Sequence, residues 1–194
     1  MASSHFNKGV VRGRILELKV RKTTANKKPY LELKVFCPSG VYGDITVKVR
    51  FWGPEVEALK AAYKERKGGM FYFHEGDVAM LESRGRKFLG YNAYKFRPWA
   101  ESPEDQPRAS IIIEGVLEVD FEKFSIRHIR GGSFPVNAVF DFPEPEFETE
   151  ATPGDRVTVY GHLKDRHARF GSTGEAEPVI EEIQIRERGH LVDG

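Results

Sequence analysis

Hydrophobic and polar residues alternate over three consecutive stretches in the first third of the chain, at 10–20, 30–36 and 45–52. Because successive side chains of a strand point to opposite faces, this alternation is typical of β-strands with one buried face. In the first stretch the alternation changes parity near Ile15 and Leu16, where a β-bulge would keep both hydrophobic sets facing inward. The pattern predicts an all-β fold.

One segment interrupts the alternation and has helical spacing instead. Residues 54–67 carry Val56, Leu59 and Tyr63 at helical spacing and are followed by two glycines. Two more strands are predicted, at 77–83 and 88–97, joined by a Gly-bearing turn. Strand, strand, strand, helix, strand, strand is the order of the five-stranded OB-fold barrel.

The second half of the chain repeats this pattern in a shorter form. Residues 112–119 are similar to 10–18, and residues 154–159 are similar to 76–81. The second copy lacks the helix, because the acidic segment 142–148 holds two prolines that forbid a regular helix. We therefore predict two tandem OB-fold barrels, with a first domain at 1–99, a linker at 100–108, a second domain at 109–188 and a tail at 189–194.

Charge divides between the two halves, although the whole chain has a net charge of only +1. Residues 1–99 hold 20 Lys and Arg against 9 Asp and Glu, and residues 100–194 hold 10 against 20. Arg12 and Arg14 of the first copy correspond to Glu114 and Val116 of the second. The split indicates an anionic partner for the first barrel and an assembly role for the second. Neutralisation of one half by the other across a domain interface is the alternative.

Basic and aromatic residues share the predicted outer face of the first barrel. OB-folds bind oligonucleotides on the face of strands 2 and 3 and on the first and last hairpin loops. Basic groups hold the phosphate backbone there, while aromatic rings stack on the bases. The expected nucleic-acid contacts are Arg12, Arg14, Lys22, Lys27, Lys28, Tyr30, Lys34, Phe36, Lys48, Arg50, Trp52, Arg84, Arg86 and Lys87.

The stretch 47–53, the helix after it, the segment 75–82 and the turn 84–88 together resemble the bacterial-type single-stranded-DNA-binding proteins. In that family an alternating strand ends in an aromatic–Gly pair, and an Arg-Lys-aromatic hairpin follows the helix. The resemblance implies base stacking by Trp52 and Phe88 and DNA contacts from the last loop. It also implies an assembly of four barrels, so we expect this two-barrel chain to form a homodimer.

The resemblance covers about residues 9–97, with a fainter echo over 110–187, and has two departures. Residues 188–194 do not match the family's acidic tail, so recruitment of other replication proteins by a tail is not expected. Thr46 stands where the family often carries Trp, so the set of stacking residues must differ.

Signs of enzymatic chemistry are weak. There is no phosphate-cradling loop of the Walker type, and Cys37, the single cysteine, excludes an intrachain disulfide and a multi-cysteine zinc site. His162 and His167 flank Asp165, and two Glu-x-Lys tripeptides begin at Glu17 and Glu32, which leaves a metal site or a nuclease as alternatives. We expect a protein that is not an enzyme and has no cofactor or metal.

The leading hypothesis is a single-stranded DNA-binding protein, largely independent of sequence, that acts in replication, recombination or repair. A single-stranded RNA-binding protein would use the same mechanism, and a protein-assembly adaptor is the alternative from another class. The chain has no apolar run of about 18 residues and no secretory h-region, so we expect a cytoplasmic location and no membrane partner.

Overall fold

The computed structural model describes residues 7–38, 44–83, 86–100, 108–120, 123–130, 136–142, 144–165 and 176–189. Contacts divide the chain into two compact units. One consists of residues 9–110 and 163–177, here called the first unit, and the other of residues 1–8, 111–162 and 178–194, here called the second unit. The domain limits expected from the sequence stay a prediction, and residues 101–107 of the expected linker lie outside the described residues. No helix in the described part of the chain is long and apolar enough to cross a membrane.

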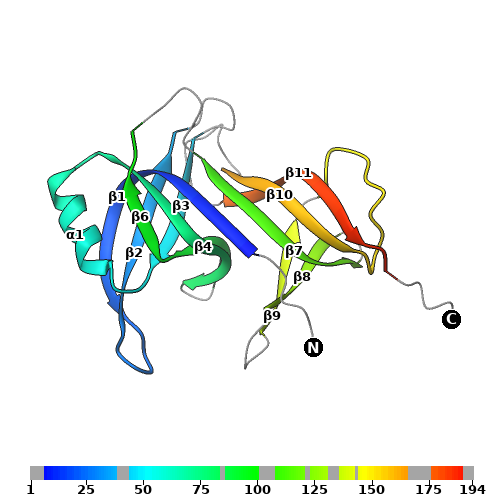
Figure 1. Cartoon of the computed structure of the whole chain (residues 1–194), viewed down its shortest axis with the longest axis horizontal. Helices are drawn as coiled ribbons and strands as arrows, with labels where there is room; N and C mark the ends of the chain where they lie inside the picture. The colour runs from blue at the N-terminus through cyan, green and yellow to red at the C-terminus, as the bar shows by residue number, and fades with distance from the viewer. Residues whose placement is uncertain are drawn as a thin grey trace. The chain divides into compact units, whose positions relative to one another are not determined.

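The strands of the first unit form a closed barrel, and a helix lies in the connection between its third and fourth strands (Figure 1). Each strand pairs with the next in the circular order β1, β2, β3, β5, β4, and β4 returns to β1. All these pairings are antiparallel except β3 with β5. This is the OB-fold order, so the expected fold class is confirmed. The elements are β1 Asn7–Lys22, β2 Pro29–Cys37, β3 Ile45–Phe51, α1 Val56–Glu65, β4 Met70–Ser83, β5 Arg86–Ala93 and β6 Lys95–Pro98.

The first strand contains the predicted bulge, but only one of its hydrophobic sets is buried. The register with β2 shifts between Ile15 and Glu17. Val11 and Ile15 are buried, whereas Leu16 is 52% exposed and Val20 is 51% exposed. Leu18 and Val20 lie opposite the buried Leu33 and Leu31, on the predicted face, but the expectation that this set is covered by the core was wrong. Beyond the bulge β1 pairs with β2 and not with β4, and it runs out into the projecting hairpin of Figure 1.

The alternating residues of β2 and β3 form the middle of the barrel core, as predicted. Leu31, Leu33, Val35, Ile45, Val47, Val49 and Phe51 are each at most 2% exposed. Cys37 ends β2 in the same core, and its burial raises the pKa of the thiol. This cysteine is therefore a core residue rather than a nucleophile.

Two strand limits differ from the prediction. The fourth strand begins at Met70 rather than at residue 77, and the last predicted strand is divided into β5 and β6 at Tyr94. Residues 70–76 read MFYFHEG, in which four consecutive rings hide the alternation between buried Phe71 and Phe73 and the outward Tyr72. The rings of Phe51, Phe71, Phe73 and Phe96 pack together, which is why this segment belongs to the barrel.

The second unit repeats the strand order without a helix. Its strands are β7 Ala109–Asp120, β8 Lys123–Arg130, β9 Val136–Phe142, β10 Arg156–Asp165 and β11 Ala176–Glu187. β8 pairs with both β7 and β9, while β10 lies between β7 and β11. The described residues 144–155, between β9 and β10, contain no helix, as the two prolines predicted.

The two copies correspond at the level of single residues. Gly13 precedes Arg14, which pairs with Phe36, and Gly115 precedes Val116, which pairs with Arg127. A Cβ at either glycine would overlap the carbonyl oxygen of that partner residue on the next strand. Because only glycine permits this close approach, the repeat seen in the sequence reflects a shared barrel geometry.

Candidate nucleic-acid interface

Two aromatic side chains on the outer face of β2 and β3 are stacked on each other. The register places Leu31 opposite Phe51, so Tyr30 and Trp52 are neighbours at the end of the ladder. Their ring centroids are 4.4 Å apart with 20° between the planes. Both were predicted as separate stacking residues, and the structure brings them together into one two-ring platform.

The indole N–H of Trp52 is held by a residue of β5. Trp52 Nε1 donates a hydrogen bond to Asn92 Oδ1 at 3.1 Å, and Asn92 Nδ2 donates to Asp77 Oδ2 at 3.3 Å. The hydroxyl of Tyr94 donates to the other oxygen of the same carboxylate at 3.4 Å. Asp77 is buried, at 9% exposed, so this chain of hydrogen bonds anchors the ring in the barrel wall.

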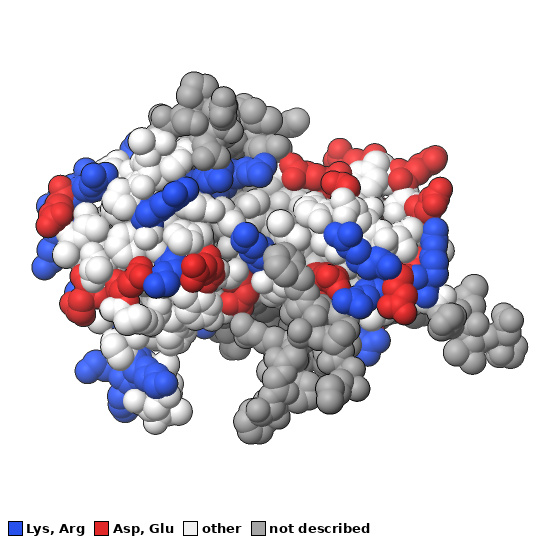
Figure 2. All heavy atoms as spheres, in the orientation of Figure 1, with Lys and Arg blue, Asp and Glu red and all other residues white. Residues whose placement is uncertain are grey.

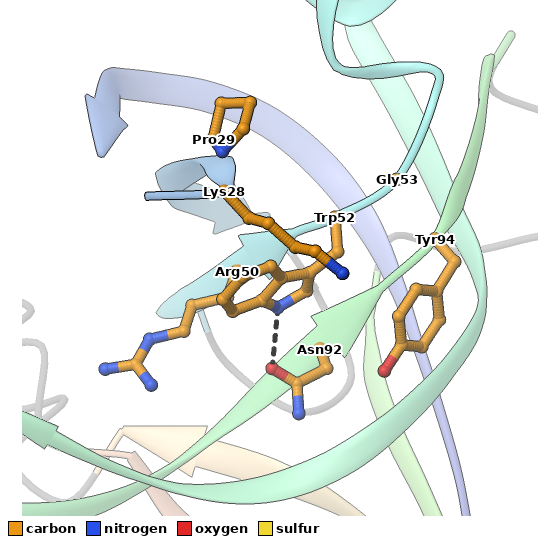
Figure 3. A pocket seen from close by; sticks show the side chains of 7 residues that line it. All are labelled: Lys28, Pro29, Arg50, Trp52, Gly53, Asn92 and Tyr94. Carbon is orange, nitrogen blue, oxygen red and sulfur yellow. Dashed lines mark hydrogen bonds between the residues drawn. The ribbon is translucent and has the colours of Figure 1, made fainter. Parts of the chain in front are cut away.

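An open pocket of about 690 Å³ lies beside this platform (Figure 3). Lys28 reaches it from the β1–β2 hairpin, Arg50 from β3 and Tyr94 from the end of β5. The guanidinium of Arg50 is 6.0 Å from the centroid of the Tyr30 ring. The remaining lining residues are Pro29, Trp52, Gly53 and Asn92. The pocket thus combines an aromatic floor with two cations, which suits a base and its phosphates.

Local backbone geometry opens this pocket and places its lysine. Gly53 has a φ of +100°, a left-handed conformation that glycine adopts readily. A Cβ built on it would have no atom within 4 Å, so the space next to Trp52 is open. In the hairpin, Thr23 N donates to the Lys28 carbonyl and Lys28 N donates to Thr23 Oγ1, both at 2.9 Å. The two bonds close the loop that carries Lys27 and Lys28.

The predicted hairpin lysines are exposed on this loop. Lys22, Lys27 and Lys28 are all exposed, and Figure 2 shows Lys and Arg side chains gathered on the hairpin. Of the predicted last-loop residues, Arg84 lies outside the described residues. The backbone of β5 pairs Arg86, Lys87 and Phe88 with β4, but their side chains also lie outside what the structure describes. Their roles stay predictions.

Farther along the same face, an acidic residue engages two of the lysines. Glu17 lies opposite Lys34, which in turn lies opposite Lys48. The carboxylate of Glu17 is 2.6 Å from Lys19 Nζ and 2.9 Å from Lys34 Nζ. Hydrogen bonds from Lys19 and Lys34 lower the pKa of Glu17 to about 2. A phosphate at Lys34 therefore has to compete with Glu17, whose ion pairs with the lysines were not predicted.

The other predicted contacts occupy different parts of the surface. Arg14 lies opposite Phe36 and Phe36 opposite Thr46, at the end of the ladder away from Trp52. Arg12 does not join them, because β1 has passed from β2 to β4 by that point and pairs Arg12 with Tyr72. Asp77, Asn92 and Tyr94 were not predicted as part of the site, although the Gly76-Asp77 pair belongs to the repeat seen in the sequence.

The alternative chemistries find little support among the described residues. Glu17, the first residue of one Glu-x-Lys tripeptide, is held by two lysines. His162 is 7% exposed and its Nδ1 is 3.1 Å from Glu181 Oε1, and His167 lies outside the described residues. No group of three or more His, Cys, Asp or Glu within the described ranges could hold a metal ion.

Basic side chains of the second unit are used inside that unit. Glu114, the counterpart of Arg12, forms an ion pair with Arg156. Asp155, the counterpart of Asp77, accepts hydrogen bonds from the backbone N–H groups of Thr152 at 2.9 Å and Gly189 at 2.7 Å, which lower its pKa. The aspartate that helps to orient the half-buried Trp52 ring in the first copy thus binds the backbone of Gly189, just after β11, in the second.

Fold and surface together define a class of protein: two tandem OB-fold barrels, the first with a stacked aromatic pair beside basic side chains. The chain is similar in fold to the wild-type single-stranded DNA binding protein from Thermus aquaticus, with a TM-score of 0.64, 14% identity, and coverage of 99% of this chain and 98% of that one. A deletion mutant of the same protein gives a TM-score of 0.62 at 14% identity, with complete coverage of both chains. No protein-family model and no curated protein sequence matches the chain. The resemblance inferred from short sequence motifs is therefore present in the fold of the whole chain.

Proposed function

We propose that this protein binds single-stranded DNA largely without regard to sequence and serves replication, recombination or repair without catalysing a reaction. The observation that carries the proposal is the Tyr30–Trp52 stack, fixed by Asn92 and bordered by Lys28 and Arg50. The fold neighbours are described as single-stranded DNA binding proteins, which supports the same function.

The physical mechanism follows from the two kinds of group in the pocket. A base stacks on the face of Trp52 that Tyr30 leaves uncovered, and each such stack contributes about 1–3 kcal/mol. Lys28 and Arg50 contact the phosphates on either side of it. Because every base has a π face and every nucleotide a phosphate, neither contact selects a sequence.

We assign the second unit to assembly rather than to nucleic-acid binding. Its arginines at 127, 156 and 188 are each engaged by a carboxylate of the same unit. The exposed residues 144, 146, 148 and 150 are all Glu, which repels phosphates. A homodimer with four barrels and a cytoplasmic location are part of the proposal, and the exposed Val139 and Phe147 of the second unit offer apolar surface for such contacts.

A competition titration tests the proposed function. Labelled single-stranded DNA bound to the full chain is displaced with unlabelled single-stranded DNA, single-stranded RNA or duplex DNA. We expect single-stranded DNA to compete best and duplex to compete worst, since paired bases cannot stack on Trp52. Stronger competition by RNA would reassign the protein to RNA, and the absence of binding to any of the three would favour the adaptor function.

A further inference from the structure

A second group of aromatic and basic side chains lies on β1, β4 and β6 of the first unit. The register places Arg12 opposite Tyr72 and Tyr72 opposite Arg97, with His74 one step farther along β4. We call Arg12, Tyr72, His74 and Arg97 the Tyr72 cluster. In the view of Figure 2, Lys and Arg side chains lie over the region where Figure 1 draws β1 and β6.

Two guanidinium groups share the Tyr72 ring. The guanidinium carbon of Arg12 is 5.1 Å from the ring centroid and that of Arg97 is 4.7 Å from it. His74 stacks on the same tyrosine with centroids 5.0 Å apart. The two guanidinium groups bring positive charge and planar sets of donors to one place on the barrel wall, which suits a backbone phosphate.

Neighbouring cations on the same strands are engaged differently. Lys95, two residues before Arg97, is 2.6 Å from Glu55, and this carboxylate raises the pKa of the lysine. Among the residues that the structure describes, no carboxylate forms an ion pair with Arg97, which is exposed. Arg97 therefore has its planar donor fork available in a position that the ring of Tyr72 orients.

The Tyr72 cluster lies next to the Trp52 pocket along the barrel wall. Tyr94 lines that pocket and Arg97 follows it by three residues, about 10 Å along an extended chain. Both β5 and β6 pair with β4, which places Asp77 opposite Asn92 and Tyr72 opposite Arg97. A strand that leaves the pocket past Tyr94 thus meets Arg97 within a few nucleotides.

We propose that the Tyr72 cluster is a second contact for the same single strand, in which Arg12 and Arg97 bind backbone phosphates of nucleotides beyond the pocket. Tyr72 holds the two guanidinium planes in place by cation–π contact. This inference rests on the proposed function and extends the site from the β2–β3 face, where OB-folds are expected to bind, onto β1, β4 and β6.

The test uses two variants: the single variant Arg97→Gln and a double variant that carries both Arg12→Gln and Arg97→Gln. The affinity of each is measured for strands of about 4 and about 16 nucleotides, the range that one OB-fold occupies. Arg186→Gln is the control, since it removes the same charge from the second unit, where Arg186 bonds to Thr158 and Tyr160. We expect the long strand to bind about tenfold more weakly to Arg97→Gln, with a salt slope shallower by about 0.7 per lost phosphate contact. The short strand, held at Trp52, should bind as it does to the unmodified chain.

Tyr72 provides a second, independent pair of variants. Tyr72→Phe keeps the ring and should bind the long strand normally, whereas Tyr72→Leu removes the π face and should weaken binding severalfold at an unchanged melting temperature. The inference is overturned if the Arg97 variants bind the long strand as tightly as Arg186→Gln does. Quenching of Trp52 by the strand would in that case still uphold the proposed function. If the unmodified chain binds neither strand, both fail together.

Discussion

At the scale of single residues, the site depends on one chain of contacts from the core to the surface. Asp77 holds Asn92, Asn92 holds the indole of Trp52, and Trp52 stacks on Tyr30. The first two of these contacts are hydrogen bonds, and the third is a stack of two rings. The half-buried Trp52 ring is therefore positioned by a carboxylate within the barrel wall and not by packing alone.

Removing the indole should weaken binding without unfolding the protein. We expect Trp52→Ala to lose about 1–3 kcal/mol of affinity for single-stranded DNA, the contribution of one base stack, and Trp52→Phe to keep most of it. The anisotropy of a labelled strand measures the affinity of each variant, because Trp52→Ala in a Trp99→Phe background would contain no tryptophan. Quenching is followed in the Trp99→Phe parent, where Trp52 is the single tryptophan. Normal binding by Trp52→Ala, with no quenching by the strand in the parent, would show that the wrong face has been assigned.

Asn92 should act as a positioning residue. Asn92→Leu leaves the indole N–H and the Asp77 carboxylate without this partner, so the Trp52 ring loses its fixed orientation. We expect a smaller loss of affinity than for Trp52→Ala, together with a changed Trp52 emission maximum in the free protein. An unchanged spectrum with unchanged affinity would remove Asn92 from the site.

At the scale of elements, ladders between strands decide which predicted residues meet. The alternation in β2 and β3 was enough to predict Tyr30 and Trp52 on one face. It was not enough for Asn92, because that residue reaches Trp52 through the parallel pairing of β3 with β5, which joins distant segments. Tyr72 was missed for another reason: consecutive aromatic residues conceal the two-residue period of β4.

The β1–β2 ladder predicts that removal of an acidic side chain strengthens binding. Glu17→Gln releases Lys19 and Lys34 from their carboxylate partner, so both become available to phosphates. We expect tighter binding of single-stranded DNA and a salt slope steeper by about 0.7 per phosphate gained. Glu57→Gln on α1, which releases Lys60 instead, is the matched control and should change neither quantity.

The same carboxylate predicts a pH effect. Its folded-state pKa of about 2 lies below its ordinary value of 4.5, so the ion pairs stabilise the fold above about pH 4.5 and are lost as the pH falls toward 2. Carboxyl chemical shifts measured by NMR across this range should show Glu17 titrating near 2. Titration near 4.5 would contradict the ladder contacts.

The glycines common to both barrels predict a loss of stability. Gly13→Ala and Gly115→Ala each press a methyl group against the carbonyl of the next strand and should cost about 1–3 kcal/mol in the free energy of unfolding. Gly68→Asn is the control, because Asn tolerates a positive φ and nothing lies within 4 Å of that position. Denaturant unfolding with equal midpoints for all three variants would argue against the shared geometry.

At the scale of the whole molecule, the order of strands was predictable because hydrophobic period and turn residues are local signals. Burial was less so: Leu16 and Val20 look like core residues in the sequence, yet each is about half exposed. The charge split was visible from composition. Which cations are engaged by carboxylates, as Lys34 is by Glu17, depends on register and so required the structure.

The assembly proposed for the chain has a direct measurement. We expect light scattering at tens of micromolar to give the mass of a dimer, twice 22.1 kDa, because two chains supply four barrels. Salt screens the partly exposed ion pairs of the second unit, so the mass should be measured at both low and moderate salt. A monomer at these concentrations would contradict the homodimer and leave the Trp52 site intact.

The stack of Tyr30 on Trp52 exists before any strand arrives, and this has a consequence for the thermodynamics of capture. A flexible ring would lose rotamer freedom on binding, and that loss would subtract from the affinity. Here folding has already restricted both rings, so an incoming base lengthens an existing column. The conformational entropy lost on association should fall on the nucleic acid, and flexible strands and rigid ones should therefore differ in affinity even when they offer the same bases.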